Sequence, residues 1–158
     1  YISLPNPNKN FDLFFRALTI LNKKLTRAVH ICLTIPIDNS RLIKTMDNFN
    51  DSNIVIKNIG KAKKSEVIEV LNSTRVSVFP SLEETFGLPL LEACQLNNFV
   101  VCSNLPFAHD VIEPSLTFNP QMEDDIADKM LLALEGDIKK SKVKVKNKLQ
   151  ELFKILLS

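Results

Sequence analysis

The sequence is poor in glycine and lacks any apolar run long enough to cross a membrane. Only three of its 158 residues are glycine, whereas an average usage of about 7% would give roughly eleven. No Gly-x-Gly-x-x-Gly follows any expected strand, which argues against a dinucleotide-binding Rossmann domain. A spanning helix needs about 18 consecutive apolar residues, and none are present.

The few cysteines and the small net charge argue against a metal site and against a partner that is bound through charge alone. Cys32, Cys94 and Cys102 lie in apolar contexts and are not spaced as metal ligands, so no metal site is expected. An odd number of buried thiols indicates a reducing, cytoplasmic setting. The formal net charge of +2 is too small to argue for a nucleic-acid or membrane partner by itself. The length suits one domain with a full core.

Apolar strand patterns alternate with helical patterns along the whole chain. Strands are expected over 1–4, 28–35, 53–59, 75–79 and 99–103, and a short strand and turn over 116–120. Helices are expected over 11–24, 38–49, 65–72, 123–134, after Gly87, and briefly before 112. This alternation predicts a three-layer α/β domain, with a Rossmann-like parallel sheet and helices on both faces. A strand at the first residue indicates a piece of a longer protein.

The three glycines fall at the ends of expected elements. Gly60 and Gly87 each follow a strand, where ligand-facing loops occur in open α/β sheets, and Gly136 is placed as a helix C-cap. The free N–H groups of the helix that begins after Gly87 are suited to an anion. Glu84 precedes that helix and Glu92 lies inside it; a carboxylate accepts hydrogen bonds from neighbouring sugar hydroxyls.

The stretch from Pro80 to Ala93 reads Pro-Ser-x-x-Glu-x-Phe-Gly-x-x-x-x-Glu-Ala. It resembles the Glu-x7-Glu motif of the group 1 glycosyltransferases, which are retaining nucleotide-sugar enzymes of the GT-B fold. The resemblance runs from Lys9 to the helix after Pro120. It implies that residues 1–138 are the donor-binding, C-terminal half of a GT-B enzyme of the hexosyltransferase type, and that the N-terminal acceptor domain is absent.

The resemblance also implies the roles of individual residues. Glu84 and Lys9 would be catalytic, with Glu84 on the hydroxyls of the donor sugar and Lys9 on the pyrophosphate. Glu92 would hold the ribose. The other implied donor-binding residues are Thr85, Phe86, Gly87, Leu88, Gly60 and Lys61. The main catalytic contribution would be electrostatic stabilisation of the departing nucleotide, with no cofactor and no required metal.

Plainer interpretations exist for each charged residue. An acid near a helix N-terminus gains roughly 0.3–1 kcal/mol from the macrodipole, which could account for Glu84. Lys9 could be a solvated loop lysine. The charges of Lys61, Lys63 and Lys64 could form a solvated face.

Two alternative functions stay open beside a glycosyltransferase. One is a sugar-nucleotide 2-epimerase on the same fold. The other is a non-catalytic nucleotide-binding or partner module, because Ser3 stands where the family usually has an arginine. The stretch 107–110 also replaces a pattern that is often Gly-Gly-x-Pro-Glu.

The last twenty residues, 139–158, are expected to form a basic amphipathic helix. Six lysines lie between positions 139 and 148, followed by an apolar stripe from Leu149 to Leu156. Such a helix could contact an anionic inner leaflet or pack on the core or the absent domain.

The expected partners are a nucleotide-sugar donor and a glycan or lipid-linked acceptor, the latter bound through the absent domain, with no nucleic acid. The expected location is the cytoplasm, with peripheral contact at the inner face of the membrane, and the expected process is polysaccharide synthesis for the cell envelope. The fragment alone is expected to bind donor at most and not to transfer sugar.

Overall fold

The computed structural model describes residues 1–145. Its helices are α1 (Phe11–Lys24), α2 (Ser40–Asp47), α3 (Lys64–Ser73), α4 (Leu88–Gln95), α5 (Pro106–Val111) and α6 (Glu123–Glu135), after a short 3-10 helix, η1 (Pro7–Lys9). Its strands are β1 (Val29–Leu33), β2 (Ile54–Asn58), β3 (Val76–Phe79), β4 (Phe99–Ser103), β5 (Ile112–Glu113), β6 (Leu116–Phe118) and β7 (Lys142–Val143). The alternation confirms the α/β class.

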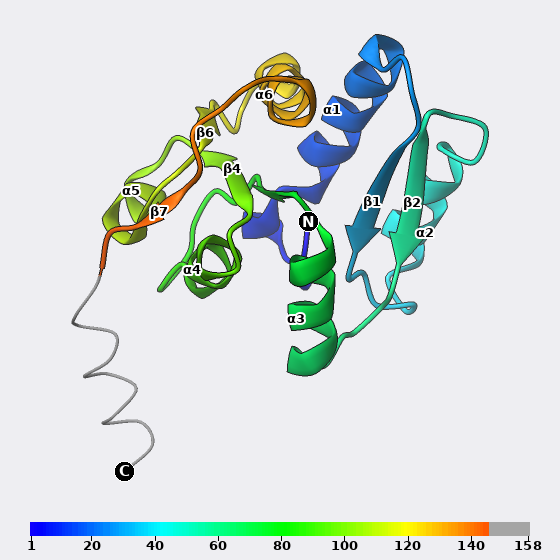
Figure 1. Ribbon diagram of the computed structural model, residues 1–158. Coiled ribbons are helices and arrows are strands. Elements are labelled where there is room, and N and C mark those ends of the chain that lie inside the picture. The colour runs from blue at the N-terminus through cyan, green and yellow to red at the C-terminus, as the bar shows by residue number, and fades with distance from the viewer. Residues whose placement is uncertain (146–158) are drawn as a thin grey trace.

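The strands form two parallel sheets and a small antiparallel pair. β1 pairs with β2, while β3, β4 and β6 lie side by side in that order. β5 and β7 form the antiparallel pair at the edge. Figure 1 shows α1 and α6 together on one face of the strands and α3 and α4 on the other. The helices on both faces give the expected three layers.

Helix α1 occupies the range that its sequence pattern predicts. Asn10 has a left-handed backbone, with φ 55°, directly before the helix. Asp12 lies in the first turn and Lys23 and Lys24 in the last, as the helix macrodipole favours. The face turned inward is wholly apolar and consists of Phe11, Leu13, Phe14, Phe15, Ala17, Leu18 and Leu21.

Strand β4 is the most enclosed strand of the domain. It pairs with β3 on one side and with β6 on the other, and Val100, Val101 and Cys102 have no exposed surface. A strand that is buried on both faces has a continuous apolar sequence rather than an alternating one. The run 99–103 was therefore recognisable as a strand from its composition.

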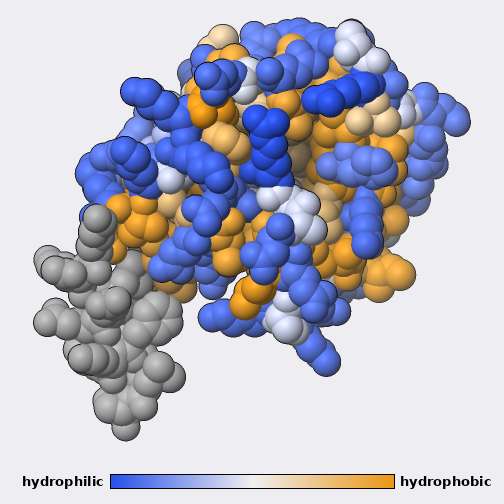
Figure 2. All heavy atoms as spheres, in the orientation of Figure 1, coloured by the Kyte–Doolittle hydropathy of each residue, from blue (hydrophilic) through white to orange (hydrophobic). Residues whose placement is uncertain are grey.

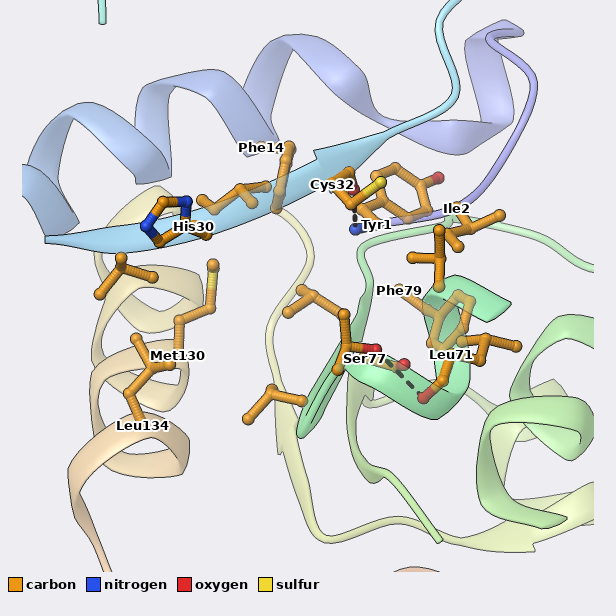
Figure 3. A pocket seen from close by; sticks show the side chains of 16 residues that line it. Tyr1, Ile2, Phe14, His30, Cys32, Leu71, Ser77, Phe79, Met130 and Leu134 are labelled. Atoms are coloured by element: carbon orange, nitrogen blue, oxygen red, sulfur yellow. Dashed lines mark hydrogen bonds between the residues drawn. The ribbon is translucent and has the colours of Figure 1, made fainter. Parts of the chain in front are cut away.

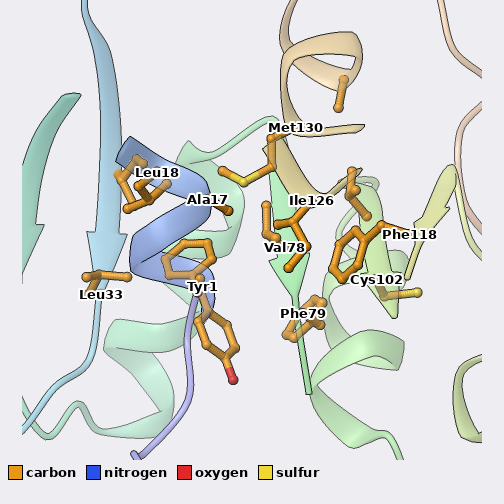
Figure 4. Packing of buried hydrophobic residues seen from close by; sticks show 14 of the residues in the cluster. Tyr1, Ala17, Leu18, Leu33, Val78, Phe79, Cys102, Phe118, Ile126 and Met130 are labelled. Carbon is orange, nitrogen blue, oxygen red and sulfur yellow. The ribbon is translucent and has the colours of Figure 1, made fainter. Parts of the chain in front are cut away.

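An aromatic cluster lies between the two sheets. The ring of Tyr1 lies 5.4 Å from that of Phe14 and 6.2 Å from that of Phe79, both edge-to-face, and such pairs contribute about 0.5–1.5 kcal/mol beyond the area they bury. Figures 3 and 4 show Tyr1 between β1, which carries Leu33, and β3, which carries Val78. The apolar core is thus continuous between the sheets although the hydrogen-bond ladder is not.

The expected strand over 1–4 is wrong. The backbone N–H of Tyr1 donates to the Cys32 carbonyl, but that of Ser3 donates to the Thr34 hydroxyl rather than to a strand backbone. One backbone bond does not make a ladder, so the segment is extended but unassigned. The expected single sheet is therefore two sheets. Several other elements are shorter than expected. For example, the strand expected over 28–35 is β1, Val29–Leu33.

The expected helix over 139–158 does not begin at 139. Lys142 and Val143 pair with β5 as a strand, and residues 146–158 lie outside the described residues. Gly136 is the C-cap of α6, as expected, with extended rather than left-handed backbone, φ −83°.

The molecular surface is mostly hydrophilic on the face seen in Figure 2, with apolar side chains visible between the polar ones. Among residues 1–145, no helix combines the length and hydropathy that crossing a membrane requires.

Candidate functional site

The loops that follow the strands gather at one edge of the domain. All pairings within the two main sheets are parallel, and Figure 4 shows β1 and β3 pointing in the same direction. The loop 80–87 after β3 therefore lies at the same edge as the loop after β2. In open α/β sheets this edge is where ligands bind.

A lysine and a glutamate that are 75 residues apart meet at this edge. Lys9 Nζ lies 2.5 Å from Glu84 Oε1, and the Ser81 hydroxyl donates to the same oxygen at 2.8 Å. Both charged side chains are largely shielded, with 15% and 9% of their surface exposed. The Tyr1 hydroxyl donates to the Lys9 carbonyl. The pair is thus held from both sides, at the end of η1 and within the loop after β3.

Asn8 and Asn10 hydrogen-bond the loop 5–10 to the loop after β3. The Asn8 carbonyl accepts from the Leu82 N–H at 2.7 Å, and the Asn8 amide donates to Glu83. The Asn10 amide donates to the Pro80 carbonyl at 3.1 Å and to the Pro120 carbonyl at 2.8 Å. One side chain therefore connects the loops that follow β3 and β6 to the start of α1.

Gly87 is the N-cap of α4 and has left-handed backbone, with φ 60°. No side chain caps the helix, and the Gly87 carbonyl accepts from Leu90 and Leu91. Pro89 has no N–H, so the first turn presents the backbone N–H of Leu88 without an intrahelical partner. A Cβ on Gly87 would lie 3.2 Å from a methyl group of Val111. Glycine is thus required both by the backbone and by the close packing of α5.

Three of the predicted donor-binding residues are open to solvent beside this turn. Thr85 is exposed, Phe86 exposes 66% of its surface and Leu88 41%. An exposed aromatic ring next to free backbone donors can be covered by a ligand. The three side chains are therefore accessible to a bound molecule.

Glu92 lies farther along α4 and makes a different contact. Its carboxylate is 3.8 Å from Lys64 Nζ, and the two side chains expose 37% and 75% of their surface. Such an exposed pair contributes little to stability. The contact places the start of α3 beside α4, so Glu92 faces the segment that follows β2 rather than the Lys9–Glu84 pair.

Gly60 and Lys61 form the segment that follows β2. Gly60 has φ 68°, and an added Cβ would meet no atom within 4 Å. Asn58 bonds both the N–H and the carbonyl of Ile35 through its side chain, which joins the ends of β1 and β2. Lys61 is exposed. The structure places these two residues at the same edge as the loop after β3.

Metal-binding and reactive-thiol chemistry have no support within residues 1–145. No group of three or more His, Cys, Asp or Glu side chains there is placed to hold a metal ion. Burial raises the pKa of all three thiols, that of Cys102 to about 12, which keeps them protonated and unreactive. Cys94 and Cys102 are core residues, and Cys32 is partly buried.

Some contacts of the site could not be identified from the sequence. Asn10 bonds carbonyls that the fold, not the local pattern, brings near, and Tyr1 reaches Lys9 only because the first segment folds back. The Lys64 side chain is 75% exposed, which agrees with a solvated face, but it also lies 3.8 Å from the Glu92 carboxylate, a contact that the sequence did not indicate. Ser81 lies three residues before Glu84 in the same loop, and this spacing is a local signal for their hydrogen bond.

The comparison with family models settles the family. Residues 1–150 match the model described as "Glycosyl transferases group 1". The chain belongs to the group 1 glycosyltransferases. The expected family is therefore confirmed over nearly the whole sequence.

Curated relatives of this group 1 glycosyltransferase chain come from Escherichia coli. The chain is 28% identical over 140 residues to a "Serotype-specific mannosyltransferase WbdA", a match that covers 86% of the chain and 17% of that protein. It is 32% identical over 83 residues to an "O-antigen chain mannosyltransferase B", covering 52% of the chain and 22% of that protein. The chain thus spans about a fifth of the length of these relatives.

A solved glycosyltransferase shares the fold. The chain superimposes on S. aureus TarM, solved with UDP, with a TM-score of 0.71 and 22% identity, covering 87% of the chain and 28% of TarM. The match confirms a GT-B type of α/β domain.

Proposed function

We propose that this chain is the donor-binding half of a retaining glycosyltransferase, which takes a hexosyl group from a nucleoside diphosphate sugar. The observation that carries the proposal is the Lys9–Glu84 pair beside an uncapped helix start. A cation and free backbone donors suit a diphosphate, and a shielded carboxylate suits sugar hydroxyls. Family membership supports the same assignment.

Each site residue then has a stated task. The diphosphate would accept a hydrogen bond from the Leu88 N–H. It would also form an ion pair with the Lys9 ammonium, which would then leave Glu84. Glu84, released from the ammonium, would accept hydrogen bonds from the sugar. The negative charge that develops on the departing nucleotide would be stabilised by Lys9 and the helix start, which are already oriented before the reaction. This chemistry requires no metal.

The nucleoside would lie between α4 and the segment after β2. Glu92 would hold the ribose hydroxyls; its contact with Lys64 at the start of α3 supports this role. Backbone groups at Gly60 and Lys61 would contact the base. Thr85 and Phe86 would cover the donor from the solvent side, where both are exposed.

The acceptor would be a glycan or lipid-linked glycan, bound by a facing domain of a longer protein. Two relatives are named as mannosyltransferases, one of them acting on an O-antigen chain, so a mannosyl donor is the first sugar to test. We place the reaction on the cytoplasmic side, with peripheral membrane contact through the basic tail.

Calorimetric titration with UDP, GDP and ADP, and then with their sugar conjugates, tests the proposal. We expect one nucleotide to bind in preference to the others, and Glu92→Ala to weaken it at least tenfold, because the ribose loses its acceptor. Glu69→Ala on the exposed side of α3 is the matched control and should bind as the parent chain does. Equal affinities for Glu92→Ala and the parent would sink the ribose role.

The products of the longer protein distinguish the alternatives. A glycoside with retained anomeric configuration is the expected product. Release of free epimerised sugar would identify a 2-epimerase. No nucleotide binding with the facing domain present would indicate a partner module.

A further inference from the structure

The cation that the proposed function assigns to the diphosphate is paired with an acid of the same chain. Lys9 Nζ lies 2.5 Å from Glu84 Oε1, and Lys9 makes no other ion pair within residues 1–145. The neighbouring acid of the same loop, Glu83, accepts from the Asn8 amide instead. A diphosphate that binds Lys9 must therefore compete with the Glu84 carboxylate.

The Lys9–Glu84 pair is shielded from water, so its separation is costly in free energy. Lys9 exposes 15% of its side chain and Glu84 exposes 9%. The Lys64–Glu92 pair exposes 75% and 37%, and water replaces such an exposed contact at little cost. A shielded carboxylate that loses its cation stays unfavourable until other donors reach it. The net affinity of a ligand that binds the Lys9 ammonium is therefore lowered by the cost of this separation.

The Lys9 side chain can move, whereas the Glu84 carboxylate is held in place. Oε1 of Glu84 also accepts from the Ser81 hydroxyl at 2.8 Å, and Ser81 is fully buried just beyond the end of β3. The Tyr1 hydroxyl holds the backbone of Lys9, but the four-carbon side chain of a lysine is flexible. Oε2 of Glu84 accepts no hydrogen bond from residues 1–145. Glu84 therefore stays in position for a new donor when the ammonium leaves.

An intact nucleotide sugar and a free nucleoside diphosphate differ in what they offer to this carboxylate. Both carry a diphosphate, which binds the Lys9 ammonium. Only the intact donor carries sugar hydroxyls, which can donate hydrogen bonds to Glu84. The sugar therefore offsets the separation of the pair, and the free diphosphate does not.

We propose that Lys9 and Glu84 form a competing ion pair that lowers the affinity of the site for the free nucleoside diphosphate and so favours the intact nucleotide sugar. This inference rests on the proposed function. After transfer the sugar hydroxyls leave Glu84, the carboxylate pairs again with Lys9, and the nucleoside diphosphate dissociates. The pair thus discriminates the donor from the product of the same reaction.

Glu84→Gln tests the competition, with Glu83→Gln as the matched control. Glutamine keeps the length of the side chain and an oxygen for the Ser81 hydroxyl, but it removes the charge that holds Lys9. Both substitutions remove one negative charge from the same loop, so a general change in the attraction for anions is common to both. The parent chain and the two variants are titrated by calorimetry with UDP and GDP, and then with UDP-glucose and GDP-mannose.

We expect Glu84→Gln to bind the preferred nucleoside diphosphate about fivefold or more tightly than the parent chain does, because Lys9 no longer has to leave a carboxylate. The dissociation constant of the diphosphate divided by that of its sugar conjugate should fall about tenfold or more, because a neutral amide accepts sugar hydroxyls less strongly than a carboxylate does. Glu83→Gln should match the parent chain in both quantities.

Three outcomes would overturn the inference. If Glu84→Gln bound the diphosphate no more tightly than the parent chain, the pair would not compete with the ligand, while binding by the parent chain would leave the proposed function standing. Equal gains in Glu84→Gln and Glu83→Gln would assign the effect to net charge. If none of the three chains bound any nucleotide, both the inference and the proposed function would be wrong.

Thermal unfolding shows whether Glu84→Gln is folded, and Glu84→Asp provides a second variant. Aspartate keeps the charge but shortens the side chain by one methylene group, which weakens the contact with Lys9. We expect Glu84→Asp to bind the diphosphate about twofold or more tightly than the parent chain does. An affinity equal to or below that of the parent chain would contradict the competition.

Discussion

At the scale of single residues, Asn10 connects more segments of the site than Lys9 or Glu84 does. Its amide holds the carbonyls of Pro80 and Pro120, and its backbone is left-handed. Asparagine tolerates this backbone better than most residues. A local pattern cannot reveal such a role, because both partners lie at least 70 positions away.

Replacing Asn10 separates its two contributions. Asn10→Gly keeps the backbone conformation but removes two hydrogen bonds, each contributing about 0.5–1.5 kcal/mol. Asn10→Ala also meets left-handed strain of about 1–2 kcal/mol. We expect both variants to unfold at lower urea concentration, Asn10→Ala at the lowest. If Asn10→Ala were as stable as Asn10→Gly, backbone strain would not contribute.

Tyr1 makes the stability of the chain depend on pH. Burial lowers the pKa of its amino group from 8.0 to about 6, so the unfolded chain binds more protons between these values. The free energy of unfolding should therefore rise with pH through this window, by about 2–3 kcal/mol for a shift of two pKa units. Below pH 6 this contribution is absent.

Urea unfolding of the parent chain and of the chain acetylated at Tyr1, at several pH values between 5 and 9, measures the effect. The two histidines are present in both chains, so the difference isolates the amine. Parallel pH profiles for the two chains would contradict the prediction.

At the scale of elements, α4 depends on its N-cap residue, Gly87. Gly87 needs left-handed backbone and also lies against Val111, whereas Gly60 needs only the backbone. We expect Gly87→Ala to destabilise the chain by about 1 kcal/mol from the backbone alone, with a further cost from the methyl contact. Gly60→Ala should show only the backbone cost.

Thermal unfolding of both variants and titration with the preferred nucleotide check this ordering. Gly87→Ala should also lower nucleotide affinity, because the turn that presents the Leu88 N–H must shift. If both variants lost the same stability, the Val111 side chain would move away from the added methyl group at no energetic cost, which contradicts the prediction.

The sequence predicted the elements that carry their own pattern. α1 and β4 have the expected bounds, since a continuous inward face and a wholly apolar run are local signals. The segment 1–4 looked like a strand, yet strand formation needs a ladder, and its neighbours are set by the fold. The Glu-x7-Glu loop was placed correctly after β3. The contacts of Lys9 with Glu84 and of Lys64 with Glu92 depend on segments distant in the sequence and were not predicted.

At the scale of the whole molecule, the two sheets should differ in local stability. β4 is paired on both sides and fully buried, while β2 is an edge strand with Val55 43% exposed. Amides in well-packed central strands open only with large free energies. Within residues 1–145, the β1–β2 sheet and the β3–β4–β6 sheet share an apolar core but no backbone hydrogen-bond ladder. The β1–β2 sheet can therefore unfold locally before the other sheet.

Native-state hydrogen exchange should show this order. The slowest amides are expected at Val100, Val101 and Cys102, and faster exchange in β2. If β2 amides were protected as strongly as those of β4, the two sheets would unfold as one unit.

Tyr1 has one more consequence, for how this protein can be observed. The sequence has no tryptophan and one tyrosine, so the near-ultraviolet emission excited beyond the phenylalanine band comes from a single ring. That ring lies between the sheets, and its hydroxyl bonds the Lys9 carbonyl. Fluorescence of the unlabelled chain therefore reports the packing between the two sheets and the surroundings of Lys9 in one signal, without a dye.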